Sequence, residues 1–228
     1  MIAPTPLKVL VINPNTSTAI TDTFKPILSS LHLLNTTISY WTCPTGPAII
    51  KSQADMYEST RYCIPPLLRL VDEFDGFLTA CYAAHPLPRI LQSYVGNKPV
   101  VGIFIASIAA ALTVVAPHSK FGILTTGEPF EPLLADGVRN LQRSQDYKEA
   151  EKLRVHFGMV AASGTDVLCM GGVILLGMEN WVHEACEAEL GIEKARQVKV
   201  IDQLVAGMWA LHSQLRHRNT IQYDIALT

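Results

Sequence analysis

Residues 8–17 read Lys8-Val-Leu-Val-Ile-Asn13 and then Pro14-Asn-Thr-Ser17, an apolar run that ends in a group of polar residues. A short apolar run bounded by turn residues is typical of a strand buried in a parallel sheet. Six further runs of this kind follow at 37–41, 76–80, 99–103, 121–124, 166–170 and 198–201, with helical stretches between them. This alternation of short buried strands and helices predicts an α/β protein.

Three of these strand-to-loop units recur in the same order about half a chain later. The pairs of similar segments are 8–17 with 120–128, 74–81 with 164–172, and 97–103 with 197–202. The repeat predicts two similar halves, residues 1–98 plus 204–228 and residues 99–203, each a parallel sheet flanked by helices. Because the carboxyl ends of parallel strands carry the site in such sheets, we expect the loops of both halves to surround one cleft.

The composition limits the class of protein. Of 228 residues, 49% are hydrophobic and 17% charged, which allows a sizeable core and argues against a disordered chain. The net charge is −2 and no basic stripe is present, so nucleic acid is not an expected partner. The uncharged stretch 100–116 is interrupted by Gly102, Ser107 and Thr113, and we expect a buried strand and a buried helix there, with no membrane span.

The five cysteines are irregularly spaced, and no Cys/His group has the spacing of a zinc site. The first eight residues lack the pattern of a signal peptide. We therefore expect reduced thiols, a cytoplasmic location and no bound metal. Cys43, Cys63 and Cys186 are expected to be structural, the first two without partners.

Polar residues at two strand ends are candidates for binding a ligand. Asn13, Asn15 and Thr16 precede a predicted helix, and Thr125 and Thr126 occupy the matching place in the second half. Such residues can cap a helix, and the free N–H groups there attract a carboxylate or carbonyl oxygen. The sequence leaves both roles open.

Cys81 ends the apolar run 76–80 and precedes Tyr82-Ala-Ala-His85-Pro86. A thiol near the start of a following helix has a lowered pKa and reacts as a thiolate, whereas a cysteine buried in a core is inert. His85 is a candidate base or substrate contact, or an ordinary turn residue before Pro86.

Several of these segments resemble the hydantoin racemase group, with its fungal relatives, of the aspartate/glutamate racemase superfamily. The segments are Val9–Ser17, Thr42–Pro47, Thr79–Cys81, Pro99–Gly102 and Thr125–Thr126, and the resemblance extends from Lys8 to Leu211. It implies two pseudo-symmetric α/β halves with the active site in the cleft between them. It further implies no cofactor, a small-molecule substrate with carbonyl or carboxylate groups, and a homo-oligomer. Thr45 and Thr79 join the expected substrate contacts.

Racemases of this family use two cysteines, one from each half, on opposite faces of the reacting carbon. The resemblance implies that Cys81 is the first. Gly172 stands where the second is expected, and Cys169, three positions earlier on a predicted strand, would point the wrong way and lie too deep.

The glycine at position 172 leaves several alternatives open. A racemase of a hydantoin or amino-acid derivative would need another base, such as His85 or His183. A single thiol can also protonate a carbanion in a lyase or decarboxylase, or attack carbon as a nucleophile in an isomerase. The N–H groups near Gly171 and Gly172 are candidates for binding an oxyanion. A small-molecule binder without catalytic activity is the remaining alternative.

Overall fold

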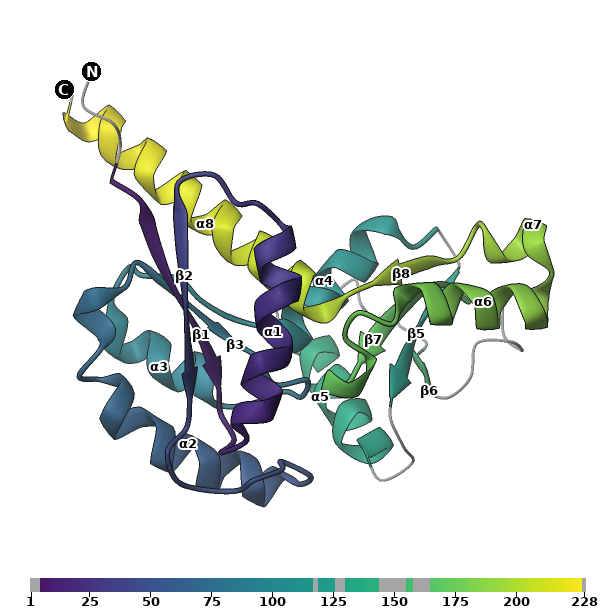
Figure 1. Cartoon of the computed structure of the whole chain (residues 1–228), viewed down its shortest axis with the longest axis horizontal. Helices are drawn as coiled ribbons and strands as arrows, with labels where there is room; N and C mark the ends of the chain where they lie inside the picture. Colours follow the sequence, from purple (N-terminus) through teal and green to yellow (C-terminus); the bar gives the residue numbers. More distant parts are fainter. Residues whose placement is uncertain (1–4, 117–118, 126–129, 144–154, 158–164, 227–228) are drawn as a thin grey trace. The chain divides into compact units, whose positions relative to one another are not determined.

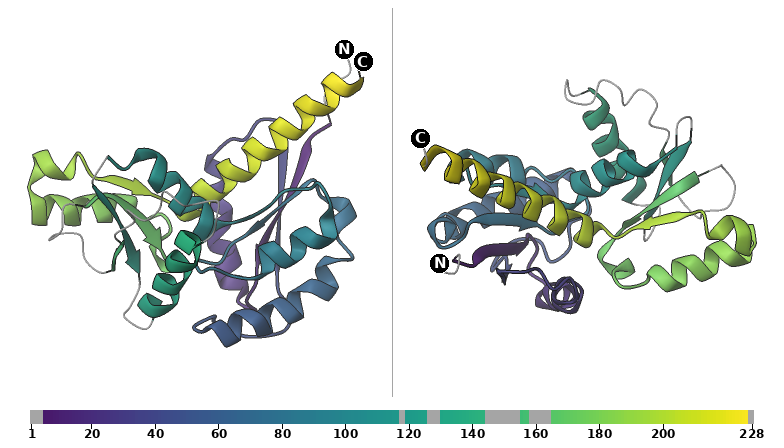
Figure 2. Two further views of the ribbon diagram at one scale, coloured as in Figure 1. Left: turned by 180° about the vertical axis from the view of Figure 1, so that it is seen from behind. Right: turned by 90° about the horizontal axis from the view of Figure 1, so that it is seen from above.

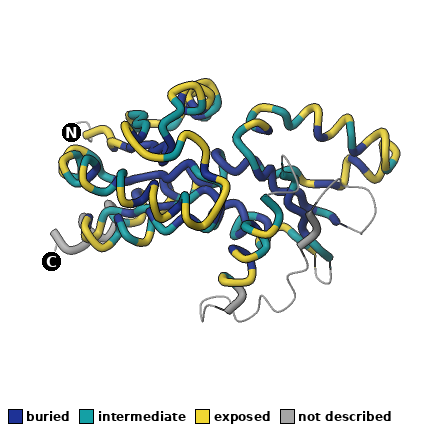
Figure 3. Tube along the Cα trace, turned by 90° about the horizontal axis from the view of Figure 1, so that it is seen from below, coloured by how far each residue is buried: buried dark blue, intermediate teal, exposed yellow. Residues whose placement is uncertain are grey.

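The computed structural model describes residues 5–116, 119–125, 130–143, 155–157 and 165–226, and the chain forms two compact units (Figure 1). The first unit contains residues 1–81, 85–103 and 207–228, and the second contains residues 82–84 and 104–206. In both units the two central strands of the sheet are mostly buried, whereas the outward faces of the helices are exposed (Figure 3).

The first unit is a four-stranded sheet in which every strand pair is parallel. The strand order is β2-β1-β3-β4, with β1 Leu7–Asn13, β2 Thr36–Thr42, β3 Gly76–Thr79 and β4 Val100–Gly102. Its helices are α1 Thr18–Ser30, α2 Gln53–Leu67, the 3-10 helix η1 Val71–Glu73, α3 Leu87–Val95 and most of α8 Gln203–Ala226. All four strands end at one edge of the sheet, so the loops that follow them gather there.

Helices cover both faces of this sheet, which is why β1 is apolar at consecutive positions. Leu10 and Ile12 pack with α2 and α3, in a cluster that includes Phe77 of β3. On the other face, Gly76 approaches Leu211 and Leu215 of α8 (Figure 2). Strands buried on both faces have continuous hydrophobic runs, since neither set of alternating side chains reaches water.

The second unit repeats this arrangement. Its parallel sheet has the order β6-β5-β7-β8, with β5 Lys120–Thr125, β6 Val155–Phe157, β7 Thr165–Gly171 and β8 Lys199–Ile201. Its helices are α4 Ile103–Val114, α5 Glu131–Arg143, the 3-10 helix η5 Val173–Leu175, α6 Glu179–Leu190 and α7 Ile192–Ala195. One core packs α4 and α5 against the sheet and another packs α6 and α7 against its other face.

The structure confirms the predicted fold class and the seven predicted strands. The three repeated segments are β1 and β5, β3 and β7, and β4 and β8, which occupy the same places in their sheets. The short strand β6 was not predicted. The predicted dividing line between residues 98 and 99 needs correction, because β4 pairs with β3 (Phe77 opposite Val100) and therefore belongs to the first sheet.

The uncharged stretch 100–116 forms β4 and then α4, as predicted. None of the helices in the described part of the chain is both long and apolar enough to cross a membrane.

Candidate functional site

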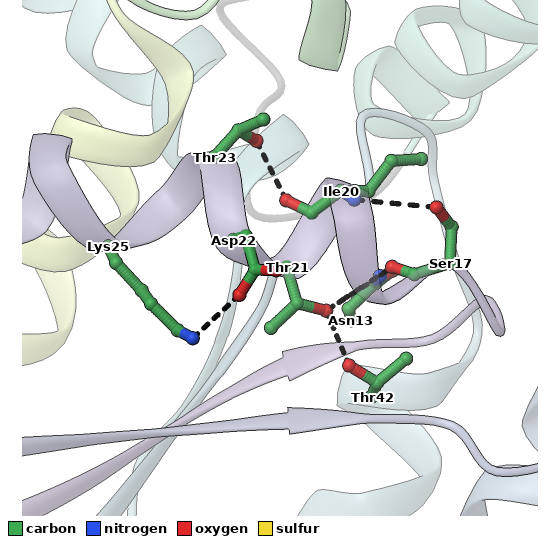
Figure 4. A network of polar contacts seen from close by, with 8 residues as sticks. All are labelled: Asn13, Ser17, Ile20, Thr21, Asp22, Thr23, Lys25 and Thr42. Atoms are coloured by element: carbon green, nitrogen blue, oxygen red, sulfur yellow. Dashed lines mark hydrogen bonds and ion pairs between the residues drawn. The ribbon is translucent and has the colours of Figure 1, made fainter.

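The side chain of Asn13, the last residue of β1, orders the loop that leads into α1 (Figure 4). Its Nδ2 donates to the carbonyl oxygen of Ser17 at 2.9 Å and to Oγ1 of Thr21 at 3.0 Å, and its Oδ1 accepts from the N–H of Asn15 at 3.2 Å. Thr21 Oγ1 in turn lies 2.6 Å from Oγ1 of Thr42 at the end of β2. Asn13 is fully buried, and both of its amide hydrogens are used within the protein. Its amide donors are therefore not available to a substrate oxygen in this arrangement.

Asn15 and Thr16 are the residues of this loop that keep polar groups available. Asn15 Oδ1 accepts from the N–H of Ser17 at 2.9 Å, and Ser17 caps α1. The N–H of Thr16 donates to the carbonyl oxygen of Pro47 at 3.2 Å, which ties this loop to the one after β2. Within the described residues, Nδ2 of Asn15 and the hydroxyl of Thr16 form no hydrogen bond.

Buried thiols stabilise the same two loops. Cys43 donates to the carbonyl oxygen of Thr45 at 3.0 Å, and Cys63 Sγ lies 3.7 Å from the carbonyl oxygen of Pro14, which also accepts from Ser59 Oγ at 2.5 Å. Both cysteines are free thiols, and their interaction with each other lowers the pKa of Cys43 and raises the pKa of Cys63. The side chain of Thr45 is exposed.

Cys81 lies just beyond β3, where the N–H of Ala80 still donates to the carbonyl oxygen of Ile12 at 2.8 Å. Of the two alternatives for this thiol, a pKa lowered by the start of a following helix is not supported, because α3 begins only at Leu87, with Pro86 as its N-cap. Burial instead raises the pKa of the Cys81 thiol to about 12, so it is protonated at neutral pH.

Two polar atoms close to Cys81 in the sequence are buried without a hydrogen-bond partner in the described part of the chain. They are Oγ1 of Thr79, the last residue of β3, and Nε2 of His85. His85 Nδ1 accepts from the N–H of Leu87 at 3.1 Å, and burial lowers the pKa of His85 to about 3. The imidazole is therefore neutral and its basic nitrogen is occupied, which argues against the expected role as a base. His183, the other base considered, is exposed on α6.

The strand ends of the second unit contain one hydroxyl without a partner and one tightly packed glycine. Oγ1 of Thr125, at the end of β5, is buried without a partner in the described structure, and Thr126 lies outside the described residues. A side chain at Gly171 would meet Ile123 Cγ2 at 2.6 Å and the carbonyl oxygen of Leu124 at 2.8 Å, so only glycine fits.

The backbone of Gly172 is held by one side-chain amide. Gln203 Oε1 accepts from the Gly172 N–H at 3.1 Å, and Gln203 Nε2 donates to the Gly172 carbonyl oxygen at 2.9 Å. The expectation that this N–H binds a substrate oxygen is therefore corrected, since the donor is already used. Cys169 is fully buried, its Sγ lies 3.6 Å from the carbonyl oxygen of Ser107, and burial raises its pKa to about 12. It lies deep in the core, as predicted.

Asp202 and Gln203 were not predicted as site residues, although both are polar and directly follow the predicted strand 198–201. Asp202 Oδ1 accepts from the N–H of Val205 at 2.7 Å. Burial and the neighbouring carboxyl of Glu179 raise the pKa of Asp202 to about 6. In the residues that the structure describes, no group of three or more His, Cys, Asp or Glu side chains is arranged to hold a metal ion.

Comparison with known proteins gives the family. The chain is 30% identical over 234 residues to an uncharacterised protein of Schizosaccharomyces pombe, with 92% of each chain covered. It is 28% identical over 215 residues to the hydantoin racemase of Pseudomonas sp. strain NS671, covering 89% of this chain and 83% of that one. The solved structure of allantoin racemase from Pseudomonas fluorescens shares the fold, with a TM-score of 0.73 at 19% identity over 92% of this chain and 91% of that one. The Asp/Glu/Hydantoin racemase model matches residues 9–211, so the chain belongs to this family.

Proposed function

We propose that this protein is a racemase-like isomerase that moves a proton at a carbon next to a carbonyl or carboxylate group, with Cys81 as the proton-transfer group. Membership of a racemase family supports an isomerase, and the hydantoin racemase relative suggests a hydantoin or an amino-acid derivative as substrate. The observation that carries the proposal is the position of Cys81 at the same edge of the sheet as the unpaired polar groups of Asn15, Thr16 and Thr79.

The protonation state of Cys81 determines the order of the proton transfers that it makes. Because the pKa of the thiol is raised, the resting enzyme holds the proton on sulfur. This proton is first lost to water, which leaves a thiolate that is a strong base, since its conjugate acid is weak. The thiolate takes the proton from the substrate carbon, so that the C–H bond breaks, an S–H bond forms and the electron pair stays on the substrate as a carbanion. The thiol then returns a proton to the carbanion from the same face, and inversion requires a second proton donor, such as water, on the opposite face.

The oxygens of the substrate need donors, because the negative charge spreads from carbon to the neighbouring carbonyl oxygen. In the first unit these donors are Asn15 Nδ2 and the hydroxyls of Thr16 and Thr79, with Thr45 at the exposed rim. Asn13 acts indirectly, by keeping the loop of Asn15 and Thr16 in place.

A second candidate is a single-thiol lyase or decarboxylase. It is favoured by Gly172, which the resemblance places where a second cysteine is expected, and by the protonated Cys81. When the carbanion forms by loss of a carboxylate group as CO₂, no base is needed, and one thiol completes the reaction by protonating one face.

The test is a chiral assay of single enantiomers of 5-substituted hydantoins and of allantoin, with Cys81→Ser and a matched Cys186→Ala control. Cys186 is a buried cysteine of α6 in the second unit, whereas the proposed substrate contacts and Cys81 belong to the first unit. Racemisation that Cys186→Ala retains and Cys81→Ser loses supports the isomerase. Loss of a carboxylate group from a malonate-type substrate, again dependent on Cys81, supports the lyase. Activity that survives in Cys81→Ser contradicts both.

A further inference from the structure

The imidazole of His85 is held in one orientation and one tautomer. Its Nδ1 accepts a hydrogen bond from the backbone N–H of Leu87, at the start of α3, so the single proton of the neutral ring is on Nε2. The side chain is 7% exposed, and Nε2 has no hydrogen-bond partner among the described residues. The Nε2–H of His85 is therefore a buried donor for which the described residues provide no acceptor.

The hydroxyl of Thr79, six residues before His85, is also buried without a hydrogen-bond partner among the described residues. Thr79 is fully buried at the end of β3, and its Oγ1 has no partner in the described part of the chain. A buried donor without an acceptor costs free energy, so native proteins rarely keep one unless a ligand or a water completes it. Two such donors flank Cys81 in the sequence, at the carboxyl end of one strand.

We propose that His85 is a neutral hydrogen-bond donor whose Nε2–H, with the hydroxyl of Thr79, binds the substrate oxygen that becomes negatively charged when the adjacent carbon loses its proton. This inference deepens the proposed function and rests on it. The ligand class is a carbonyl compound that forms an enolate, such as the ring carbonyl of a hydantoin.

A neutral donor suits this role because no charged side chain has to be buried beside the substrate before the reaction. Burial alone lowers the pKa of His85, and no neighbouring charge contributes. The ring is therefore neutral near pH 7, and Nε2 keeps its proton there. The donor gains strength only as charge develops on the oxygen, which favours the transition state over the substrate.

The experiment is ¹⁵N NMR of the His85 imidazole in the wild-type protein, with and without 5,5-dimethylhydantoin. This probe presents the ring carbonyls but has no hydrogen at C5, so it binds without reacting. We expect a neutral ring protonated at Nε2 from pH 5 to pH 8, and a downfield shift of the Nε2–H proton on binding. A ring protonated at Nδ1, an imidazolium at neutral pH, or an Nε2–H signal that does not respond to the probe would overturn the proposal.

Two variants separate the donor from a base. His85→Gln keeps an N–H donor without a basic nitrogen, and His85→Leu removes both. We expect His85→Leu to lower kcat about 10²- to 10³-fold, as for loss of one oxyanion donor, with His85→Gln within about tenfold of wild type. Equal losses in both variants would contradict the donor role. If Cys81→Ser keeps full activity while the Nε2–H signal still responds to the probe, the proposed function fails and the His85 contact stands.

Discussion

The two units have the same strand order, yet the chemistry at their strand ends differs. In the first unit, Thr79 Oγ1 and His85 Nε2, on either side of Cys81 in the sequence, have no hydrogen-bond partner among the described residues. In the second, Thr125 Oγ1 is likewise unpartnered in the described structure, but the backbone of Gly172 is hydrogen-bonded by the side-chain amide of Gln203 and neighbouring groups pack closely against Gly171. The two sheets have the same strand order, and the residues that follow each strand determine which polar groups at that edge are already hydrogen-bonded within the protein.

The largest expected effect on stability comes from a substitution at Gly171, where the end of β7 is tightly packed. Gly171→Ala places a methyl group against Ile123 and the backbone oxygen of Leu124, and backbone cannot move aside as a side chain does. We expect a loss of about 3 kcal/mol in the free energy of unfolding, measured by urea denaturation.

Gly172→Ala is the matched control, because a φ of 178° and ψ of 148° describe an extended backbone that any residue adopts. We expect a clearly smaller loss there. Equal stability of Gly171→Ala and wild type would mean that the second unit is not closed by packing at this position.

The next effect tests the ordered loop of the first unit. Thr21→Val keeps the shape of the side chain but removes the hydroxyl that joins Asn13 to Thr42. Because Asn13 is buried and loses an acceptor, we expect a loss of about 1–2 kcal/mol in urea denaturation.

Thr23→Val removes a hydroxyl from the exposed side of the same helix, where it bonds only the Ile20 carbonyl oxygen, and should change stability by less than about 0.5 kcal/mol. Similar losses in the two variants would show that the hydrogen bonds around Asn13 contribute no more to the free energy of unfolding than one exposed hydroxyl does.

The smallest effect is a pH dependence in the second unit. The folded-state pKa of Asp202 is about 6, above the ordinary 3.8, so between these values the folded protein keeps a proton that the unfolded chain releases. This contribution to stability is present below about pH 4 and is lost as the pH rises through 6. His85 acts in the opposite sense, since its lowered pKa makes stability fall as the pH drops from 6.5 toward 3.

Asp202→Asn keeps an acceptor for the Val205 N–H and removes the titration. Relative to the variant, we expect the wild-type free energy of unfolding to fall by an amount on the order of 1 kcal/mol between pH 4 and pH 6.5. Glu179→Gln should shift this fall to lower pH, because the Glu179 carboxyl helps to raise the pKa of Asp202. A constant difference between wild type and Asp202→Asn would contradict the assignment.

The strands were predictable because each is a short apolar run bounded by polar residues, and the repeat gave their correspondence between the units. The short strand β6 has the sequence Val-His-Phe and no such run. The place of β4 was missed because a parallel strand does not reveal its partner in the sequence; only the pairing of Phe77 with Val100 shows it.

Cys81 became a candidate through the family resemblance, because its place at a strand end also fits an inert core cysteine, and its protonation state could not be predicted. The helix that follows begins at Leu87, and the sequence before Pro86 did not show that the intervening residues form a loop. The tautomer of His85 depends on one hydrogen bond, and the contact between Gln203 and Gly172 consists of two hydrogen bonds between residues 31 positions apart. Local patterns carry no information about such contacts.

The most direct test of the central claim is deuterium incorporation at C5 of one enantiomer of a 5-substituted hydantoin in D₂O, followed by proton NMR, for wild type and Cys81→Ala. We predict exchange in the wild type and a loss of about 10³-fold or more in the variant, comparable to removal of other essential proton-transfer groups. Exchange with retained configuration would assign one-sided proton transfer to the single thiol, and appearance of the other enantiomer would establish a racemase. Exchange at the same rate in Cys81→Ala would contradict the account.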